Sequence, residues 1–257
     1  MIHLEGLVKT VQAGAAMVAV YESRVAMGKA AAADAAAVLR KILSEKEEAN
    51  VLFPCAVSQL EMFDALFAAE GIDWSRVNGF VMIEYLGLPK NHPALLSKFA
   101  EKYIFSCANF KSGNTINGTN PDFETECVRY ASLLADKPID FSCIGIGENG
   151  HLAYNEPHVA NFNDEKLVKI VEIDAASKKQ VVRDGTFQTL EEVPKLVMTV
   201  TIPPILAPHM IATVPGVRKA NILYDTVNAE ISTVCPATIL RKYEMVIYTD
   251  LDGAKYL

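Results

Sequence analysis

The residues most suited to chemistry lie in one short loop, residues 144–157, which reads IGIGENGHLAYNEP. The loop holds three glycines, two glutamates and a histidine, and the apolar run FSCI leads into it, so it should leave a buried strand. A histidine can take up and release protons near neutral pH. His151 and Glu156 are therefore candidates for acid–base chemistry, and the alternative is an ordinary loop histidine beside a solvated or capping carboxylate.

Alternating apolar and helical segments surround this loop from residue 50 onward. The strand candidates are NVLFP (50–54), GFVMI (79–83), DFSCIGIG (140–147), KLVMTVTI (195–202), MIATVP (210–215) and MVIYTD (245–250). The helical candidates are residues 58–69, 93–105, 122–137 and 216–225, and an alanine-rich helical segment over residues 7–46 precedes them all. This alternation predicts a single-domain, Rossmann-like α/β fold over residues 1–257, with a doubly wound, mostly parallel sheet and helices on both faces.

The expected sheet also predicts where a ligand would bind. Ligands of open parallel sheets bind at the carboxyl ends of the strands, near the point where the strand order reverses. The loops after Pro54, Ile83, Gly147 and Pro215 are therefore expected to meet in one crevice.

Composition narrows the class of protein. The net charge of -7 and pI of about 5.3, without a basic run, argue against nucleic acid and anionic membranes as partners. The five cysteines are scattered without a C-x-x-C spacing, which argues against a disulfide framework or a zinc site and fits a reducing cytoplasm. We expect neither a signal peptide at the N-terminus nor a membrane-spanning segment.

Four ordered segments resemble the signatures of a known family. MIEYLGLPKNHP (82–93), GIGENGHLAYNEP (145–157), VPGVRKA (214–220) and CPATIL (235–240) are similar to the successive motifs of the glucosamine-6-phosphate deaminase/isomerase family, which is related to the 6-phosphogluconolactonases. The resemblance covers most of the chain from about residue 50. It implies a cytoplasmic homo-oligomer that acts on a small sugar phosphate, with no metal and no organic cofactor.

The reaction of that family opens an amino-sugar ring, moves a proton between C2 and C1 and releases ammonia. By resemblance, His151 is the ring-opening histidine and Glu156 the carboxylate that orients it. Asn149 stands where most members have Asp; an amide cannot act as a base, but it can fix the tautomer of His151 by a hydrogen bond.

The resemblance also assigns the phosphate site, together with Gly147 and Gly150 as substrate-binding residues of the loop. Lys219 matches the phosphate lysine, although a solvated surface lysine is an equal alternative. In PCAVSQ (54–59), Ser58 matches a phosphate-loop residue, but the glycine typical of that loop is missing, so Ser58 could instead be a plain helix cap. The phosphate arginine has no counterpart, because Arg183 stands at the wrong offset.

This chain lacks one group that the family reaction requires. The family reads Met-Asp-Glu-Tyr where this chain reads Met-Ile-Glu-Tyr, so the carboxylate that resembles the C2 base is replaced by Ile83. The adjacent Glu84 should point away from the side that Ile83 faces, because side chains alternate along a strand, and it could substitute only if the backbone turns there. We therefore expect sugar-phosphate binding with feeble or absent deaminase activity. The alternatives are a non-catalytic binding protein and a 6-phosphogluconolactonase-type hydrolase.

Overall fold

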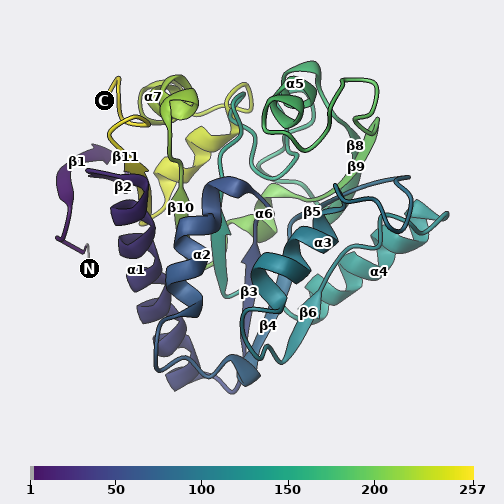
Figure 1. The fold of residues 1–257 in the computed structure, drawn as a ribbon, viewed down its shortest axis with the longest axis horizontal. Helices are drawn as coiled ribbons and strands as arrows, with labels where there is room; N and C mark the ends of the chain where they lie inside the picture. The colour runs from purple at the N-terminus through teal and green to yellow at the C-terminus, as the bar shows by residue number, and fades with distance from the viewer. Residues whose placement is uncertain (1–2) are drawn as a thin grey trace.

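The computed structural model describes residues 3–257 and contains one large sheet (Figure 1). The sheet has the strand order β1-β2-β11-β10-β7-β3-β4-β6. Its strands are β1 Leu7–Ala13, β2 Ala16–Tyr21, β3 Ala49–Phe53, β4 Val77–Val81, β6 Ser112–Asn114, β7 Phe141–Ile144, β10 His209–Thr213 and β11 Val246–Asp250. Only β1 and β2 pair antiparallel; the other pairs are parallel, which confirms the expected mostly parallel α/β fold.

Helices cover this sheet. They are α1 Arg24–Glu45, α2 Leu60–Phe67, α3 Leu96–Ala100, α4 Phe123–Asp136, α5 Ala175–Arg183, α6 Ile202–Ile205 and α7 Ala220–Asn228. In Figure 1, α1 and α2 descend side by side at the left, and α7 and α5 lie at the top. The first two helices pack closely because α1 has glycine at position 28, where a Cβ would come within 2.6 Å of Glu61 on α2.

The expected helix over residues 7–46 is wrong in its first part, where the chain forms the hairpin β1–β2. Val8, Thr10 and Val11 favour a strand because β-branched side chains fit a pleated surface. Gly14 makes the turn with a φ of +64°. The helix begins only at Arg24, where the Ser23 side chain accepts a hydrogen bond from the N–H of Ala26.

A second, three-stranded sheet corrects two further expectations, since the segment 195–202 and the end of the segment 79–83 belong to it and not to the parallel sheet. It has the order β5-β9-β8, from β5 Ile83–Tyr85, β9 Leu196–Val200 and β8 Val168–Glu172, and its pairs are antiparallel. The run 79–83 is thus not one strand, because β4 ends at Val81. Met82 is the corner between the sheets: its N–H donates to Phe53 O and its carbonyl accepts from Val200 N.

The strand order of the large sheet reverses beside β3. The chain passes from β3 to β4 and β6 on one side, whereas β7, β10 and β11 follow in order on the other side. The loops that leave β3 and β7 therefore diverge at this point, which is where an open α/β sheet offers a crevice to a ligand.

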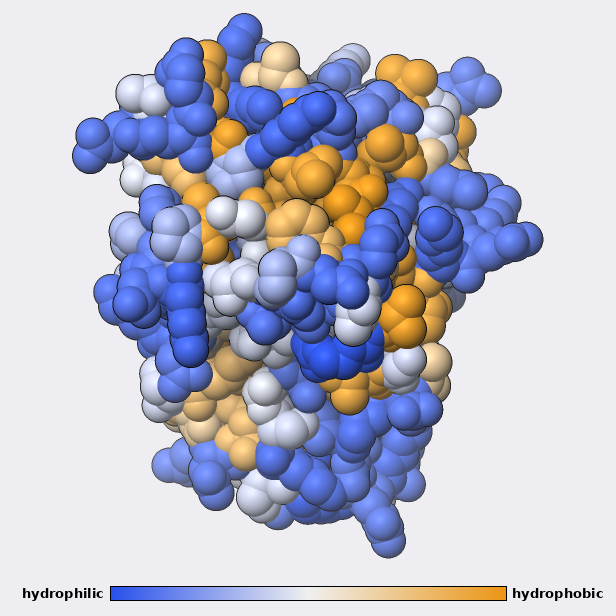
Figure 2. All heavy atoms as spheres, turned by 90° about the vertical axis from the view of Figure 1, so that its right-hand side faces the viewer, coloured by the Kyte–Doolittle hydropathy of each residue, from blue (hydrophilic) through white to orange (hydrophobic). Residues whose placement is uncertain are grey.

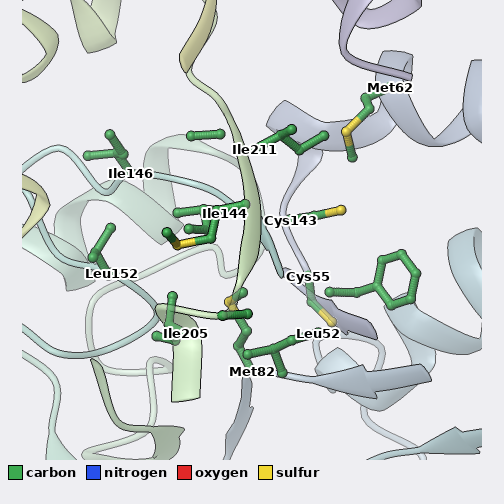
Figure 3. Close-up of a cluster of buried hydrophobic side chains, with 14 of the residues drawn as sticks. Leu52, Cys55, Met62, Met82, Cys143, Ile144, Ile146, Leu152, Ile205 and Ile211 are labelled. Atoms are coloured by element: carbon green, nitrogen blue, oxygen red, sulfur yellow. The ribbon is translucent and has the colours of Figure 1, made fainter. Parts of the chain in front are cut away.

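Buried apolar side chains support the loops at this crevice. Figure 3 shows Leu52 of β3, Cys143 of β7 and Ile211 of β10 in one cluster with residues of the loops. Leu152, next to His151, is fully buried in the same cluster. The histidine loop is thus anchored to the core by its own apolar residue.

The face in Figure 2 is largely hydrophilic, with apolar patches between the charged side chains. Within residues 3–257, no helix combines the length and the apolar character that a membrane span requires.

Candidate active site

A cavity of about 1150 Å³ lies at the carboxyl ends of the central strands. Its lining includes residues from the loops after β3, β7 and β10, the strand β5, the segment around α3, and α5. The four loops that were expected to meet do so, although Ile83 reaches the cavity from the second sheet. Ser58, His151 and Lys219 all line this one space.

His151 is held as a neutral base. Its side chain is only 13% exposed, and its Nδ1 lies 3.1 Å from the hydroxyl of Ser177. Burial, reinforced by the positive charge of Lys219, lowers the pKa of His151 to about 3. The ring passes so close to Gly147 that a Cβ there would lie 2.1 Å from Nε2, so this position requires glycine.

Glu156 is fully buried behind this histidine. One oxygen accepts the backbone N–H of Asp174 at 2.7 Å. The other oxygen, Oε1, lies 3.9 Å from His151 Nδ1 and has no hydrogen-bond partner among the described residues. Burial raises the pKa of Glu156. The Ser177 hydroxyl contacts the imidazole at Nδ1, the same ring nitrogen that Glu156 Oε1 approaches to 3.9 Å.

The sequence does not predict a role for Ser177, because that role depends on a contact formed by folding. It lies in the first turn of α5, where its backbone N–H donates to the capping carboxylate of Asp174 at 2.7 Å. The segment DAAS has the spacing of a helix N-cap, which predicts the helix start but not the contact with a loop 26 residues away.

Asn149 and Gly150 stabilise the conformation of the loop and do not line the cavity. Asn149 Oδ1 accepts the backbone N–H of His151 at 3.1 Å, and its amide donates to Asp174 at 2.7 Å. The expected control of the His151 tautomer by Asn149 is therefore wrong, since Ser177 is the partner of the ring. Gly150 adopts a φ of +85°, and a Cβ there would lie 2.8 Å from Cys235 Sγ; it packs away from the cavity that Gly147 lines.

Lys219 lies close enough to His151 for its positive charge to act on the imidazole. Its ammonium donates to the carbonyl of Ile146 at 2.6 Å, and burial lowers its pKa to about 8. Ser58 lies in the short 3₁₀ turn Val57–Gln59, where its hydroxyl accepts from the Gln59 side chain at 3.2 Å and makes no capping bond to α2. Arg183 pairs with Glu148 and does not line the cavity.

The wall formed by β5 differs from the histidine side. Ile83 and Tyr85 line the cavity, whereas Glu84 faces the opposite way and is 1% exposed. Its carboxylate accepts the backbone N–H groups of Tyr85 at 2.8 Å, Leu96 at 2.8 Å and Ser97 at 2.7 Å. Glu84 thus caps the start of α3, and its expected place among the catalytic residues is wrong.

One group within residues 3–257 has the ligand types for a metal ion. Glu156, His158 and Asp174 bring one atom each within 4.8 Å of one another. Both oxygens of Asp174 already accept hydrogen bonds, from Ser177 N and from the Asn149 amide. This group therefore serves as the polar support of the histidine loop.

Comparisons with known proteins agree with this geometry. The family model of glucosamine-6-phosphate isomerases/6-phosphogluconolactonase matches residues 22–248. A glucosamine-6-phosphate deaminase of Bacillus cereus is 31% identical over 210 residues, covering 81% of this chain and 78% of the relative. One from Lactobacillus delbrueckii subsp. bulgaricus is 29% identical over 190 residues, covering 74% and 79%.

Solved structures show the same fold. A monomeric glucosamine-6-phosphate deaminase aligns with a TM-score of 0.83 and 22% identity, covering 93% of this chain and 99% of the other. A 6-phosphogluconolactonase of Thermotoga maritima aligns with a TM-score of 0.72 and 16% identity, covering 91% and 99%. The chain belongs to the family of glucosamine-6-phosphate isomerases and 6-phosphogluconolactonases.

Proposed function

We propose that this protein binds a sugar phosphate in the cavity and lacks the proton transfer at C2 that amino-sugar isomerisation requires. The phosphate lies between Lys219 and Ser58, and the sugar ring lies against His151. A buried ammonium and a hydroxyl are suitable donors to a phosphate ester, and their loops follow β10 and β3, on either side of β7, and line the same cavity.

The observation that carries this proposal is the pair Ile83 and Glu84. The side chain that faces the cavity is a hydrocarbon, and the neighbouring carboxylate is occupied by three backbone N–H groups on the other side of β5. Two other carboxylates on the cavity wall are paired with arginines: Glu148 with Arg183, and Asp184 with Arg218.

Calorimetric titration with glucose 6-phosphate tests the binding site. The wild type should bind the phosphate ester and not glucose, and Lys219→Ala should lower the affinity about 10- to 100-fold, because hydrogen bonds to charged groups contribute about 1.5–3 kcal/mol. Lys41→Ala removes the same charge from an exposed position of α1 and is the matched control. Equal affinity in the wild type and Lys219→Ala would refute the phosphate assignment.

A second candidate function is hydrolysis of a sugar-phosphate lactone. It is favoured by the position of His151, which lines the cavity, hydrogen-bonds to Ser177 through Nδ1 and has no hydrogen bond at Nε2 among the described residues. In the tautomer that carries its proton on Nδ1, Nε2 can take a proton from water as the water attacks the lactone carbonyl, and no base at carbon is needed. Release of acid from 6-phosphogluconolactone above the spontaneous rate tests it; a rate equal to background excludes it.

A further inference from the structure

Apolar side chains line the cavity where α3 packs against β5, and this part of the wall is called the apolar lobe. It comprises Ile83, Leu95 and Phe99 together with Tyr103, whose ring centroid lies 4.8 Å from that of Phe99; Lys98 and Lys102 also line the cavity. The cavity, at about 1150 Å³, exceeds the range of about 300–1,000 Å³ usual for small-molecule sites. If the phosphate and ring lie at the Lys219 and His151 end, this lobe has room for a further substituent.

A hydrogen-bond donor stands next to the lobe. Tyr85 follows Ile83 by two residues, so both side chains leave β5 on the same face, about 6–7 Å apart along the strand. The hydroxyls of Tyr85 and Tyr154 lie 3.1 Å apart, and both residues line the cavity. The pair has two protons and one shared hydrogen bond, so one proton has no acceptor among the described residues.

We propose that the lobe holds the acyl group of a 2-acylamino sugar phosphate, so that this protein recognises an N-acylated amino sugar in preference to one with a free amine. The inference rests on the proposed function, which puts C2 of the sugar beside Ile83. The methyl group of an acetyl would pack against Ile83, Leu95 and Phe99, and its carbonyl oxygen would accept the spare proton of the tyrosine pair.

A free amine fits this lobe poorly. At neutral pH it is an ammonium group, which would lose water against the Ile83 side chain, and the neighbouring carboxylate, Glu84, faces away. Acylation removes the charge and adds the apolar surface that the lobe matches. The replacement of a carboxylate by isoleucine thus changes which substrate the site accepts.

Calorimetric titration with N-acetylglucosamine 6-phosphate, glucosamine 6-phosphate and glucose 6-phosphate tests the inference. The acetylated sugar should bind about 10-fold or more tightly than the amine, the scale of discrimination by one apolar group in a hydrophobic pocket. Ile83→Asp should reverse this order, because a carboxylate attracts the ammonium. Val128→Asp makes the same change at an exposed position of α4 outside the cavity and should preserve the wild-type order.

The outcomes separate the two proposals. Equal or tighter binding of glucosamine 6-phosphate overturns the acyl-group assignment while leaving sugar-phosphate binding in place. Absence of binding by all three phosphate esters overturns both. An unchanged preference in Ile83→Asp also contradicts the assignment, because the lobe would then not be the element that discriminates.

Discussion

The two walls of the cavity carry different kinds of side chain. On one wall, a neutral histidine contacts a serine hydroxyl and lies 3.9 Å from a buried glutamate, and an asparagine and an aspartate hold the loop in place. On the other wall, Ile83 of β5 faces the cavity. The carboxylate of β5, Glu84, accepts hydrogen bonds from the N-terminus of α3. We propose that the first wall moves protons on oxygen, whereas the second presents a hydrocarbon side chain, Ile83, where proton transfer at carbon would need a base.

The two walls come from different parts of the fold. Lys219, His151 and Ser58 lie in the loops after β10, β7 and β3 of the large sheet. Ile83 belongs instead to the second sheet, which the chain enters through Met82. Under the proposed function, a substitution at Ile83 therefore removes one step without disturbing the residues proposed to bind the phosphate.

Removing His151 should have the largest effect. His151→Gln preserves hydrogen bonding but cannot carry a proton, so hydrolysis of a sugar-phosphate lactone should fall by about 10²–10⁴-fold, the usual contribution of a positioned acid or base. Turnover is measured alongside the affinity for glucose 6-phosphate. Full hydrolytic activity in this variant would show that the histidine wall is not the reactive one.

Glu84→Gln should act on stability and leave the cavity unchanged. An amide has one acceptor oxygen for three backbone N–H groups, so the cap of α3 loses about 1–2 kcal/mol. The unfolding temperature should fall by about 2–8 °C, with the affinity for glucose 6-phosphate unchanged. A loss of affinity at constant stability would return Glu84 to the functional site.

Ser177→Ala should have a smaller effect on the histidine wall. Ser177 positions the imidazole and does not face the reaction directly, so the variant should lower kcat for lactone hydrolysis about five- to tenfold and leave KM unchanged. Ser177→Thr, which keeps the hydroxyl, should restore most of the rate. A change in KM alone would indicate a binding role.

The pH dependence of binding should be the smallest effect. Lys219, with a pKa lowered to about 8, loses its charge as the pH rises through that value, and a phosphate ester is already a dianion there. The affinity for glucose 6-phosphate should therefore fall about fourfold between pH 7 and 8.5, in proportion to the charged fraction of the lysine. An unchanged affinity over this interval would mean that Lys219 does not contact the phosphate.

The same lysine has a predictable effect on stability. Its folded pKa is below the unfolded value of about 10.4, so the unfolded chain binds more protons between these values. The free energy of unfolding of the ligand-free protein should rise with pH from about 8 to 10.4. Lys219→Met should remove this increase in thermal melts across the interval.

The sequence predicts the parallel sheet because continuous apolar runs such as FSCI, residues 141–144, cannot alternate between core and solvent. It fails at the N-terminus, where the alanines after Arg24 bias the preceding hairpin toward helix although Gly14 marks its turn. The prediction from sequence is wrong again at Met82. The apolar run is unbroken there, so it does not indicate that the backbone hydrogen bonds of Met82 join one sheet through its N–H and the other through its carbonyl.

The candidate site was predictable where each role depends on residue type. His151 can shuttle a proton and Lys219 can hold an anion, and both line the cavity, as does the adjacent Arg218. Ser177 and Glu84 were not predictable, because their roles depend on partners brought together by folding. The first is identified by its contact with an imidazole 26 residues away, and the second by the helix that it caps.

The most direct test of the missing carbon base is the release of ammonia and fructose 6-phosphate from glucosamine 6-phosphate. Wild type, Ile83→Asp and Ile83→Asn are compared; the asparagine variant has the size of aspartate without its basicity. We expect wild type and Ile83→Asn to be near background and Ile83→Asp to gain at least about 10²-fold, the lower end of what a positioned base contributes. Robust turnover by the wild type that Ile83→Asp does not increase would contradict the account.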